Sequence, residues 1–183
     1  MPMTDDLLAR IDRIESYQAI QQLPIRYALA VDGRDIDAWL NLFIDDVDCG
    51  RRGKGREALK SYIAPAVQNF YRSQHLICGH RIDFVDADHA TGEVYCRAEH
   101  EDGDRWVVMA ICYSDTYERR NGTWYFVRRK EQHWYAADVL ERPSGPQWSN
   151  WEATPPPAFP AAFPTWARFW SEAGEEAVAR RTR

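Results

Sequence analysis

Hydrophobic positions recur at helical spacing in the first part of the chain. From Thr4 to Val31 they fall on one face of a predicted helix: Leu7, Leu8, Ile11, Ile14, Ile20, Leu23, Tyr27 and Val31. Pro24 lies within this pattern, so we expect a kink or two helices in series. Asp35 is placed as the N-cap of a short second helix over residues 36–43, with Trp39, Leu40 and Phe43 as its apolar positions. A short strand near VDC (residues 47–49) and a third helix within residues 51–73 are expected next.

The period changes to that of β-structure in the second half. Residues 75–85, 91–101, 105–120 and 123–135 form long strand-like runs separated by turn signals. The strongest of these signals is Asn121-Gly122, a pair that favours a type I′ hairpin turn. Helices followed by an antiparallel meander predict an α+β protein, with N-terminal helices packed on one face of a curved, mostly antiparallel sheet.

Composition changes again after Pro143. Residues 143–183 are rich in proline and large aromatic residues, too aromatic for a disordered linker. Its large aromatic side chains are Trp148, Trp151, Phe159, Phe163, Trp166, Phe169 and Trp170. We therefore divide the chain into a domain of residues 1–142 and an extension of residues 143–183. The extension is expected to pack on the domain or on a neighbouring subunit, because exposed it would form a sticky surface.

Charge and motifs exclude several functional classes. The net charge of −5 argues against nucleic-acid binding, and no apolar run is long enough to span a membrane. The acidic start MPMTDDLLAR does not resemble a signal peptide, so we expect a cytoplasmic protein. The four cysteines are isolated in apolar, strand-like contexts and are expected to be buried free thiols. Without zinc spacing, a P-loop or a G-x-G-x-x-G motif, we expect neither metal nor cofactor.

Asp32 is an anomaly at the end of the first predicted helix. The C-terminal end of a helix presents unsatisfied carbonyls and favours cations, yet Asp32 places a carboxylate there. Gly33 follows as a residue that tolerates the left-handed conformation that often ends helices. Asp-Gly is also a common turn pair, so this stretch alone does not identify a functional carboxylate.

Alternation along the strands identifies further candidates. His100 belongs to the apolar, inward set of its strand, and His75 opens the preceding strand on the face of Ile77. Gly79 predicts a bulge, which leaves the direction of His80 open. Strict alternation places Arg129 with Tyr125 and Val127, and Arg128 with Trp124 and Phe126. One of these arginines must therefore lie against apolar surface, where it either extends its head to water or meets an acidic partner.

Together these residues suit proton abstraction with stabilisation of a developing negative charge. The set comprises a carboxylate, two inward histidines, a tyrosine one turn before the carboxylate and a semi-buried arginine: Asp32, His75, His100, Tyr27 and Arg129. Taken one at a time, each has an ordinary structural interpretation. Ser73 and Ser114 lack a recognisable nucleophile elbow, and no redox centre is evident.

The chain resembles the SnoaL-like branch of the nuclear transport factor two-like superfamily, whose fold is a cone-shaped α+β barrel. The resemblance covers about Leu7 to Asp138 and rests on four ordered motifs: YALAVDGRD, HLICGHRIDFVDAD, GEVYCRAEH and YERRNGTWYFVRRK. Scytalone dehydratases, hexachlorocyclohexane dehydrochlorinases and bile-acid dehydratases belong to this branch. They are cofactor-independent lyases built on an Asp–His dyad, and they are commonly trimers.

The resemblance implies roles for the candidate residues. Asp32 matches the helix-terminal aspartate and His75 the base, while His100 matches the second histidine of scytalone dehydratase. Tyr27 stands where the dehydratases carry tyrosine and the dehydrochlorinase carries lysine, which favours an oxygen leaving group. Arg129 matches an arginine in the last strand of the dehydrochlorinase and bile-acid enzymes.

We therefore expect a lyase that removes water, halide or a small carbonyl such as formaldehyde from a bulky aromatic or polycyclic substrate, as in the catabolism of aromatic compounds. The implied assembly is a homo-oligomer, most simply a trimer. An isomerase or polyketide cyclase using the same base is an alternative. A non-catalytic ligand-binding protein or small subunit of a ring-hydroxylating dioxygenase is another, because one fold hosts many functions.

Overall fold

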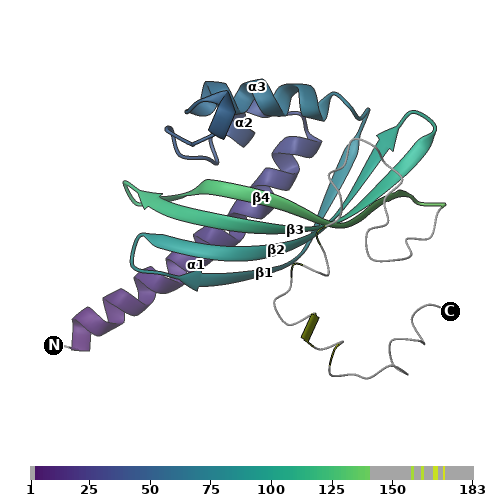
Figure 1. Cartoon of the computed structure of the whole chain (residues 1–183). Helices are drawn as coiled ribbons and strands as arrows, with labels where there is room; N and C mark the ends of the chain where they lie inside the picture. The colour runs from purple at the N-terminus through teal and green to yellow at the C-terminus, as the bar shows by residue number, and fades with distance from the viewer. Residues whose placement is uncertain (1–2, 141–157, 159–161, 163–166, 169–170, 172–183) are drawn as a thin grey trace.

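The computed structural model describes residues 3–140 together with residues 158, 162, 167, 168 and 171. Within these residues, helices precede strands (Figure 1). The helices are α1 (Met3–Asp32), α2 (Ile36–Leu40) and α3 (Arg56–Val67), with a 3₁₀ turn at Gly50–Arg52. The strands are β1 (Ser73–Phe84), β2 (His89–Asp102), β3 (Arg105–Arg120) and β4 (Thr123–Asp138). They form one antiparallel sheet in the order β1-β2-β3-β4, which confirms the predicted α+β class.

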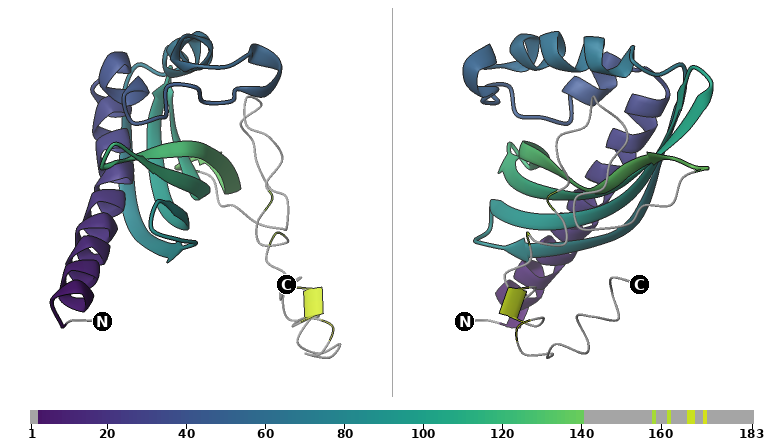
Figure 2. Two further views of the ribbon diagram at one scale, coloured as in Figure 1. Left: turned by 90° about the vertical axis from the view of Figure 1, so that its left-hand side faces the viewer. Right: turned by 45° about the vertical axis from the view of Figure 1, so that its right-hand side comes forward.

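The sheet curves around the C-terminal half of α1. This helix contacts both β1 and β4, which are the two outer strands of the sheet order. Both outer strands can reach one helix only if the sheet bends towards it. The shorter helices α2 and α3 lie beside the C-terminal end of α1, on the β4 side of the sheet (Figures 1 and 2).

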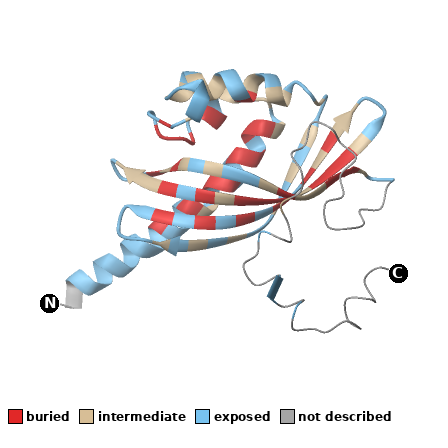
Figure 3. Ribbon diagram, viewed as in Figure 1, coloured by how far each residue is buried: buried red, intermediate tan, exposed pale blue. Residues whose placement is uncertain are grey.

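Helix α1 is continuous through Pro24, which rules out two helices in series, one of the two alternatives predicted there. Its apolar positions divide by location (Figure 3). Near the C-terminal end they are buried: Ile20, Leu23, Tyr27 and Val31. Near the N-terminal end they are 42–59% exposed: Leu7, Leu8, Ile11 and Ile14. The difference arises because the N-terminal half of the helix extends past the edge of the sheet (Figure 1).

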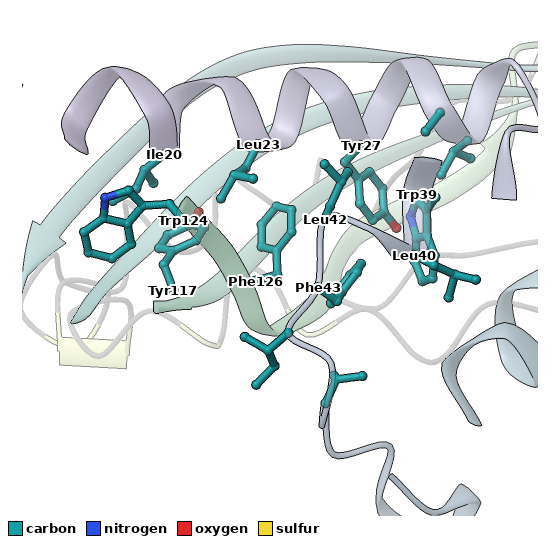
Figure 4. Close-up of a cluster of buried hydrophobic side chains, with 14 of the residues drawn as sticks. Ile20, Leu23, Tyr27, Trp39, Leu40, Leu42, Phe43, Tyr117, Trp124 and Phe126 are labelled. Atoms are coloured by element: carbon teal, nitrogen blue, oxygen red, sulfur yellow. The ribbon is translucent and has the colours of Figure 1, made fainter. Parts of the chain in front are cut away.

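Aromatic side chains dominate the core between α1, α2 and the sheet (Figure 4). The Trp39 and Phe43 ring centroids are 4.8 Å apart, and those of Phe43 and Phe126 are 5.2 Å apart. Helix α2 begins as predicted, because the Asp35 side chain accepts a hydrogen bond of 2.9 Å from the Ala38 backbone N–H. A second cluster continues the core along the inner face of the sheet: Val94, Cys96, Ala98, Val107, Met109, Ile111, Tyr113 and Ala136.

Turns and bulges set the register of the strands. Asn121 and Gly122 have φ of 52° and 79°, which confirms the type of hairpin turn expected between β3 and β4. The bulge expected near Gly79 lies between Ile77 and Gly79 in β1. A second bulge, which was not predicted, lies in β4 between Phe126 and Arg128. It shifts the pairing of β4 with β3.

This second bulge overturns the predicted orientation of the β4 arginines. Tyr117 pairs with Phe126, but Asp115 pairs with Arg129, so one extra residue separates these positions on β4. Arg129 therefore shares the inner face with Phe126, whereas strict alternation had placed it with Tyr125 and Val127. Arg128 pairs with Thr116 and is exposed.

Two other expectations are corrected. The segment near VDC forms only an isolated bridge between Asp48 and Lys54, not a strand. Cys96 and Cys112 are buried, but Cys49 is half-buried and Cys78, at the β1 bulge, is exposed. The expectation of four buried thiols is therefore wrong for two of them.

Most of the extension over residues 143–183, including its large aromatic residues, lies outside the described residues. One described contact joins it to the sheet: the Ala158 backbone N–H donates to the His133 carbonyl at 3.0 Å. In the part of the chain that the structure describes, no helix has the length and apolar character to cross a membrane.

Candidate active site

A cavity of about 620 Å³ lies between the inner face of the sheet and the helices. Its helical wall is largely apolar, with Trp39, Phe43, Leu59, Ile63, Ala66, Val67 and Phe70 contributed by α2, α3 and the segments that follow them. Its strand wall carries polar groups. Four of the five predicted site residues line the cavity: Tyr27, His75, His100 and Arg129. Asp32 reaches the site through its contact with His75.

The structure brings Asp32 and His75, the two residues of the predicted dyad, into direct contact. The His75 Nδ1 lies 2.7 Å from the Asp32 Oδ1, and the His75 backbone N–H donates to Oδ2 at 2.8 Å. The His75 side chain is 8% exposed and the Asp32 side chain is 23% exposed. Nδ1 carries the proton when it donates to the carboxylate, so Nε2 holds the lone pair that could accept a proton. Burial raises the Asp32 pKa, but the hydrogen bonds from His75 and Ser73 outweigh it and the net pKa is lowered.

Ser73 and Arg34 explain why a carboxylate is stable at this helix end. The Ser73 hydroxyl donates to the Asp32 Oδ1 at 2.9 Å. The Arg34 guanidinium donates to the Ser73 Oγ and to the helix-end carbonyl of Val31, both at 2.8 Å. A cation therefore satisfies the helix terminus beside the carboxylate. Arg34, with φ of 58°, takes the left-handed conformation, and Gly33 does not; the expectation for Gly33 is wrong.

His100 lies beside the dyad on the next strand. Its ring is 5.5 Å from that of His75, centre to centre, and perpendicular to it at 89°. The residue is only 5% exposed, and its Nδ1 has no partner among the described residues. Burial and the nearby His75 lower the His100 pKa to about 4, so the ring is neutral at neutral pH. A neutral ring has one N–H donor and one acceptor nitrogen.

Arg129 is held in a buried ion pair. Its guanidinium donates to both oxygens of Asp115, at 2.9 Å and 2.7 Å, and the two side chains are 4% and 0% exposed. The guanidinium carbon also lies 4.5 Å and 4.1 Å from the ring centres of Tyr27 and Tyr113. Burial opposes the charge, but Asp115 outweighs it and raises the Arg129 pKa. Its Nη1 has no hydrogen-bond partner in the described part of the chain, which leaves the two N–H groups of that nitrogen available.

His80 points inward and continues the network of Asp115. The Tyr117 hydroxyl donates to the Asp115 Oδ2 at 2.8 Å, and His80 Nε2 lies 2.9 Å from the same hydroxyl. Burial lowers the His80 pKa to about 4, although Asp115 acts in the opposite direction. This arrangement settles the direction that the sequence left open and gives His80 a structural role beneath Arg129.

Tyr27 packs between the dyad and the aromatic core. Its ring centre is 6.5 Å from that of His75 and 5.9 Å from that of Tyr113. The residue is 8% exposed, and burial raises its pKa, so the phenol stays protonated. Tyr27 can therefore donate a hydrogen bond in the cavity but does not act as an anion there.

Glu131 and His133 are cavity residues that the sequence reasoning missed. They follow Arg129 at alternate positions of β4, and pair with Tyr113 and Ile111 on the inner face. The alternation that identified the histidines of the preceding strands could also have identified these two residues. The mixed charges of the segment RRKEQH obscured that pattern. Among the described residues, no group of three or more His, Cys, Asp or Glu side chains is arranged to hold a metal ion.

Comparison with known proteins agrees with this architecture. The family model of the SnoaL-like domain matches residues 12–130. The gamma-hexachlorocyclohexane dehydrochlorinase of Sphingobium indicum is 28% identical over 129 residues, which cover 67% of this chain and 83% of that protein. A second dehydrochlorinase of that species, hexachlorocyclohexane dehydrochlorinase 1, is 28% identical over 124 residues, covering 64% and 80% of the two chains.

Solved structures show the same fold. A type-3 hexachlorocyclohexane dehydrochlorinase from Novosphingobium barchaimii superposes with a TM-score of 0.63 at 27% identity, covering 73% of this chain and 96% of that one. A protein assigned as a scytalone dehydratase from Novosphingobium aromaticivorans superposes with a TM-score of 0.62 at 22% identity, covering 73% and 93%. The second likeness shows the fold alone. The family match spans well over half of the sequence, and the chain belongs to the SnoaL-like domain family.

Proposed function

We propose that this protein is a cofactor-independent lyase that eliminates water, halide or a small carbonyl compound from a bulky hydrophobic substrate. The observation that carries the proposal is the 2.7 Å contact between Asp32 and His75 at the wall of a 620 Å³ cavity. A histidine oriented by a carboxylate is a common general base. The related dehydrochlorinases carry the name of an elimination reaction, which supports the same reaction class here.

In the proposed mechanism, His75 Nε2 removes a proton from a carbon or hydroxyl of the substrate. Asp32 holds the ring in the tautomer that leaves Nε2 unprotonated, and it stabilises the imidazolium that forms. The hydrogen bonds from Ser73 and from the His75 backbone keep the carboxylate oriented and charged. A base positioned in this way is worth about 10²–10⁴ in rate.

Three donors face the developing negative charge or the leaving group. Tyr27 supplies a protonated phenol, His100 a neutral imidazole and Arg129 an Nη1 group without a hydrogen-bond partner among the described residues. Because Arg129 is already neutralised by Asp115, its contribution is a directed hydrogen bond more than a free positive charge. The three groups together would form an oxyanion-type site beside the base.

The cavity supports a bulky, largely apolar substrate. Its volume is within the range of sites for drug-sized ligands, and its helical wall is built from aliphatic and aromatic side chains. We infer an aromatic or polycyclic compound, and Tyr27 in place of a lysine favours an oxygen leaving group. A homotrimer remains our prediction for the assembly; monomeric behaviour in light scattering would contradict it.

A substrate screen tests the proposal. Hydroxylated diaryl compounds, steroids and cyclic β-hydroxyketones are followed by absorbance, and hexachlorocyclohexane by chloride release, with wild type and His75→Ala. We expect the wild type to convert at least one class and His75→Ala to lose at least about 100-fold in rate. Equal conversion by the two proteins, or none by the wild type, would contradict the proposal.

A further inference from the structure

Most charged groups around the cavity already have protein partners. Asp32 uses both oxygens, accepting hydrogen bonds from Ser73 and from the ring and backbone of His75. Arg129 donates to both oxygens of Asp115. Arg34 donates to the Ser73 hydroxyl and to the carbonyls of Val31 and Phe70. These groups shape the site, but little of their charge is free to meet a ligand.

Arg128 and Lys130 border the cavity but belong to the outer face of β4. They pair with Thr116 and Ser114, and both are exposed. They also border a second hollow of about 300 Å³, which the exposed Arg81 shares. Because solvent surrounds these two side chains, water and salt screen their charges. They therefore do not define the charge inside the cavity.

Glu131 is different, because it presents an accessible carboxylate to the interior. Its Oε1 lies 2.7 Å from His133 Nε2, at an ion-pair distance without hydrogen-bond alignment. In the part of the chain that the structure describes, its Oε2 has no hydrogen-bond partner. The Glu131 side chain is 42% exposed, and His133 behind it is 6% exposed. This exposed surface lies on the cavity side of β4, opposite Tyr113 on β3.

The surroundings keep Glu131 ionised. Enclosure of the carboxylate opposes its charge, but the contact with His133 outweighs it, with smaller contributions from His75 and His100. The net result is a lowered Glu131 pKa. Glu131, His75 and His100 line the same cavity. His75 is on β1 and Glu131 is on β4, which are the two outer strands. The Glu131 carboxylate therefore reaches the cavity from the edge of the sheet opposite to that of His75.

We propose that Glu131 is a substrate-anchoring residue that accepts a hydrogen bond from a neutral alcohol or phenol of the ligand, with His133 as its positioning residue. An ionised carboxylate accepts hydrogen bonds but donates none. It binds an O–H group and repels a carboxylate, sulfonate or phosphate at the same position. The cavity therefore selects uncharged, hydroxylated aromatic compounds over anionic analogues of similar size. The inference deepens the proposed function. It rests on that proposal in taking the cavity as the substrate site, and it does not depend on the chemistry of the dyad.

A pair of matched probes tests this selectivity without any turnover. 4-Phenylphenol and 4-phenylbenzoate have the same biphenyl body, and at pH 7 the first is neutral and the second is charged. Binding of each is measured by titration calorimetry to wild type, Glu131→Gln and Glu93→Gln. Glu93 is the matched control, because it is a half-exposed glutamate of the same sheet on the outer face. Thermal unfolding establishes that each variant is folded.

We expect the wild type to prefer the phenol, and Glu131→Gln to reduce that preference about 10- to 100-fold, the size expected for a hydrogen bond to a charged group. Glu93→Gln should keep the wild-type preference. His133→Asn should weaken phenol binding less than Glu131→Gln does, since it removes only the support of the carboxylate. An unchanged preference in Glu131→Gln would overturn the proposal, and so would failure of the wild type to bind either probe.

The dyad is judged separately in the same experiment. His75→Ala should change the preference far less than Glu131→Gln does, because the anchor lies on the other outer strand. Loss of the preference in Glu131→Gln but not in His75→Ala supports the anchor whatever the outcome of the substrate screen. Loss in His75→Ala but not in Glu131→Gln would place the hydroxyl at the dyad and overturn the anchor.

Discussion

Asp32 binds His75 twice, through the ring Nδ1 at 2.7 Å and through the backbone N–H at 2.8 Å. The double contact fixes both the position of the strand residue and the rotation of its ring. Helix α1 and strand β1 are therefore joined at the position of the proposed base, His75. A carboxylate is unfavourable at a helix end in isolation. Here it supports a strand, and in the proposed mechanism it also fixes the tautomer of the base.

Ser73→Ala should weaken the dyad without dismantling it. The substitution removes the 2.9 Å hydrogen bond to the Asp32 Oδ1 and the acceptor of the Arg34 guanidinium. We expect turnover to fall about 10-fold or more and the free energy of unfolding to fall by about 1.5–3 kcal/mol, since hydrogen bonds to two charged groups are lost. Steady-state kinetics and urea unfolding measure the two effects. Ser61→Ala, on the exposed side of α3, is the control; wild-type turnover in Ser73→Ala would show that the serine does not support the base.

The ion pair between Asp115 and Arg129 predicts a large cost for removing one partner. Both side chains are almost fully buried, so Asp115→Asn would leave a guanidinium charge uncompensated. We expect Asp115→Asn to lower the free energy of unfolding by about 3–5 kcal/mol. Combining it with Arg129→Met should restore part of this loss, because the double variant buries no unpaired charge. A loss below about 1 kcal/mol in urea unfolding of the single variant would contradict this description.

How much of this site could be predicted from the sequence depends on the regularity of the strands. Two-residue alternation placed His75 and His100 on the inner face, and the structure confirms both positions. The same rule failed for Arg129, because a bulge in β4 shifted the register by one residue. Bulges depend on how two paired strands twist and on what their side chains meet, which one strand alone does not reveal.

Other parts of the site depend on distant pairs of residues. Arg34 and Ser73 lie 39 positions apart, so no local pattern indicates that they jointly support Asp32. Cys78 was expected to be buried, but its place at the bulge of an outer strand exposes it. The helix, the hairpin and the inward histidines follow from local rules, whereas the supports of the dyad follow from tertiary packing.

Stability should increase with pH between about 4 and 6.5. His80 and His100 have pKa values of about 4 in the folded protein, against 6.5 when unfolded. Across this interval the unfolded chain binds protons that the folded chain does not, so acidification favours unfolding. Each histidine adds a slope of up to about 1.4 kcal/mol per pH unit.

Urea unfolding at several pH values measures this slope. His80→Gln and His100→Gln should each make the pH dependence shallower. His89→Gln is the control, since His89 is exposed at the start of β2, away from the buried network. A slope that is the same in wild type and in both buried-site variants would show that these histidines are not the groups that titrate.

The measurement that tests the dyad most directly is a double-mutant cycle on turnover. Rates are compared for wild type, Asp32→Asn, His75→Ala and the variant that carries both, on the best substrate of the screen. If Asp32 acts through His75, each single variant loses about 10²–10⁴ in rate and the double variant is no slower than His75→Ala alone. Losses that multiply, or turnover of Asp32→Asn at the wild-type rate, would contradict the account.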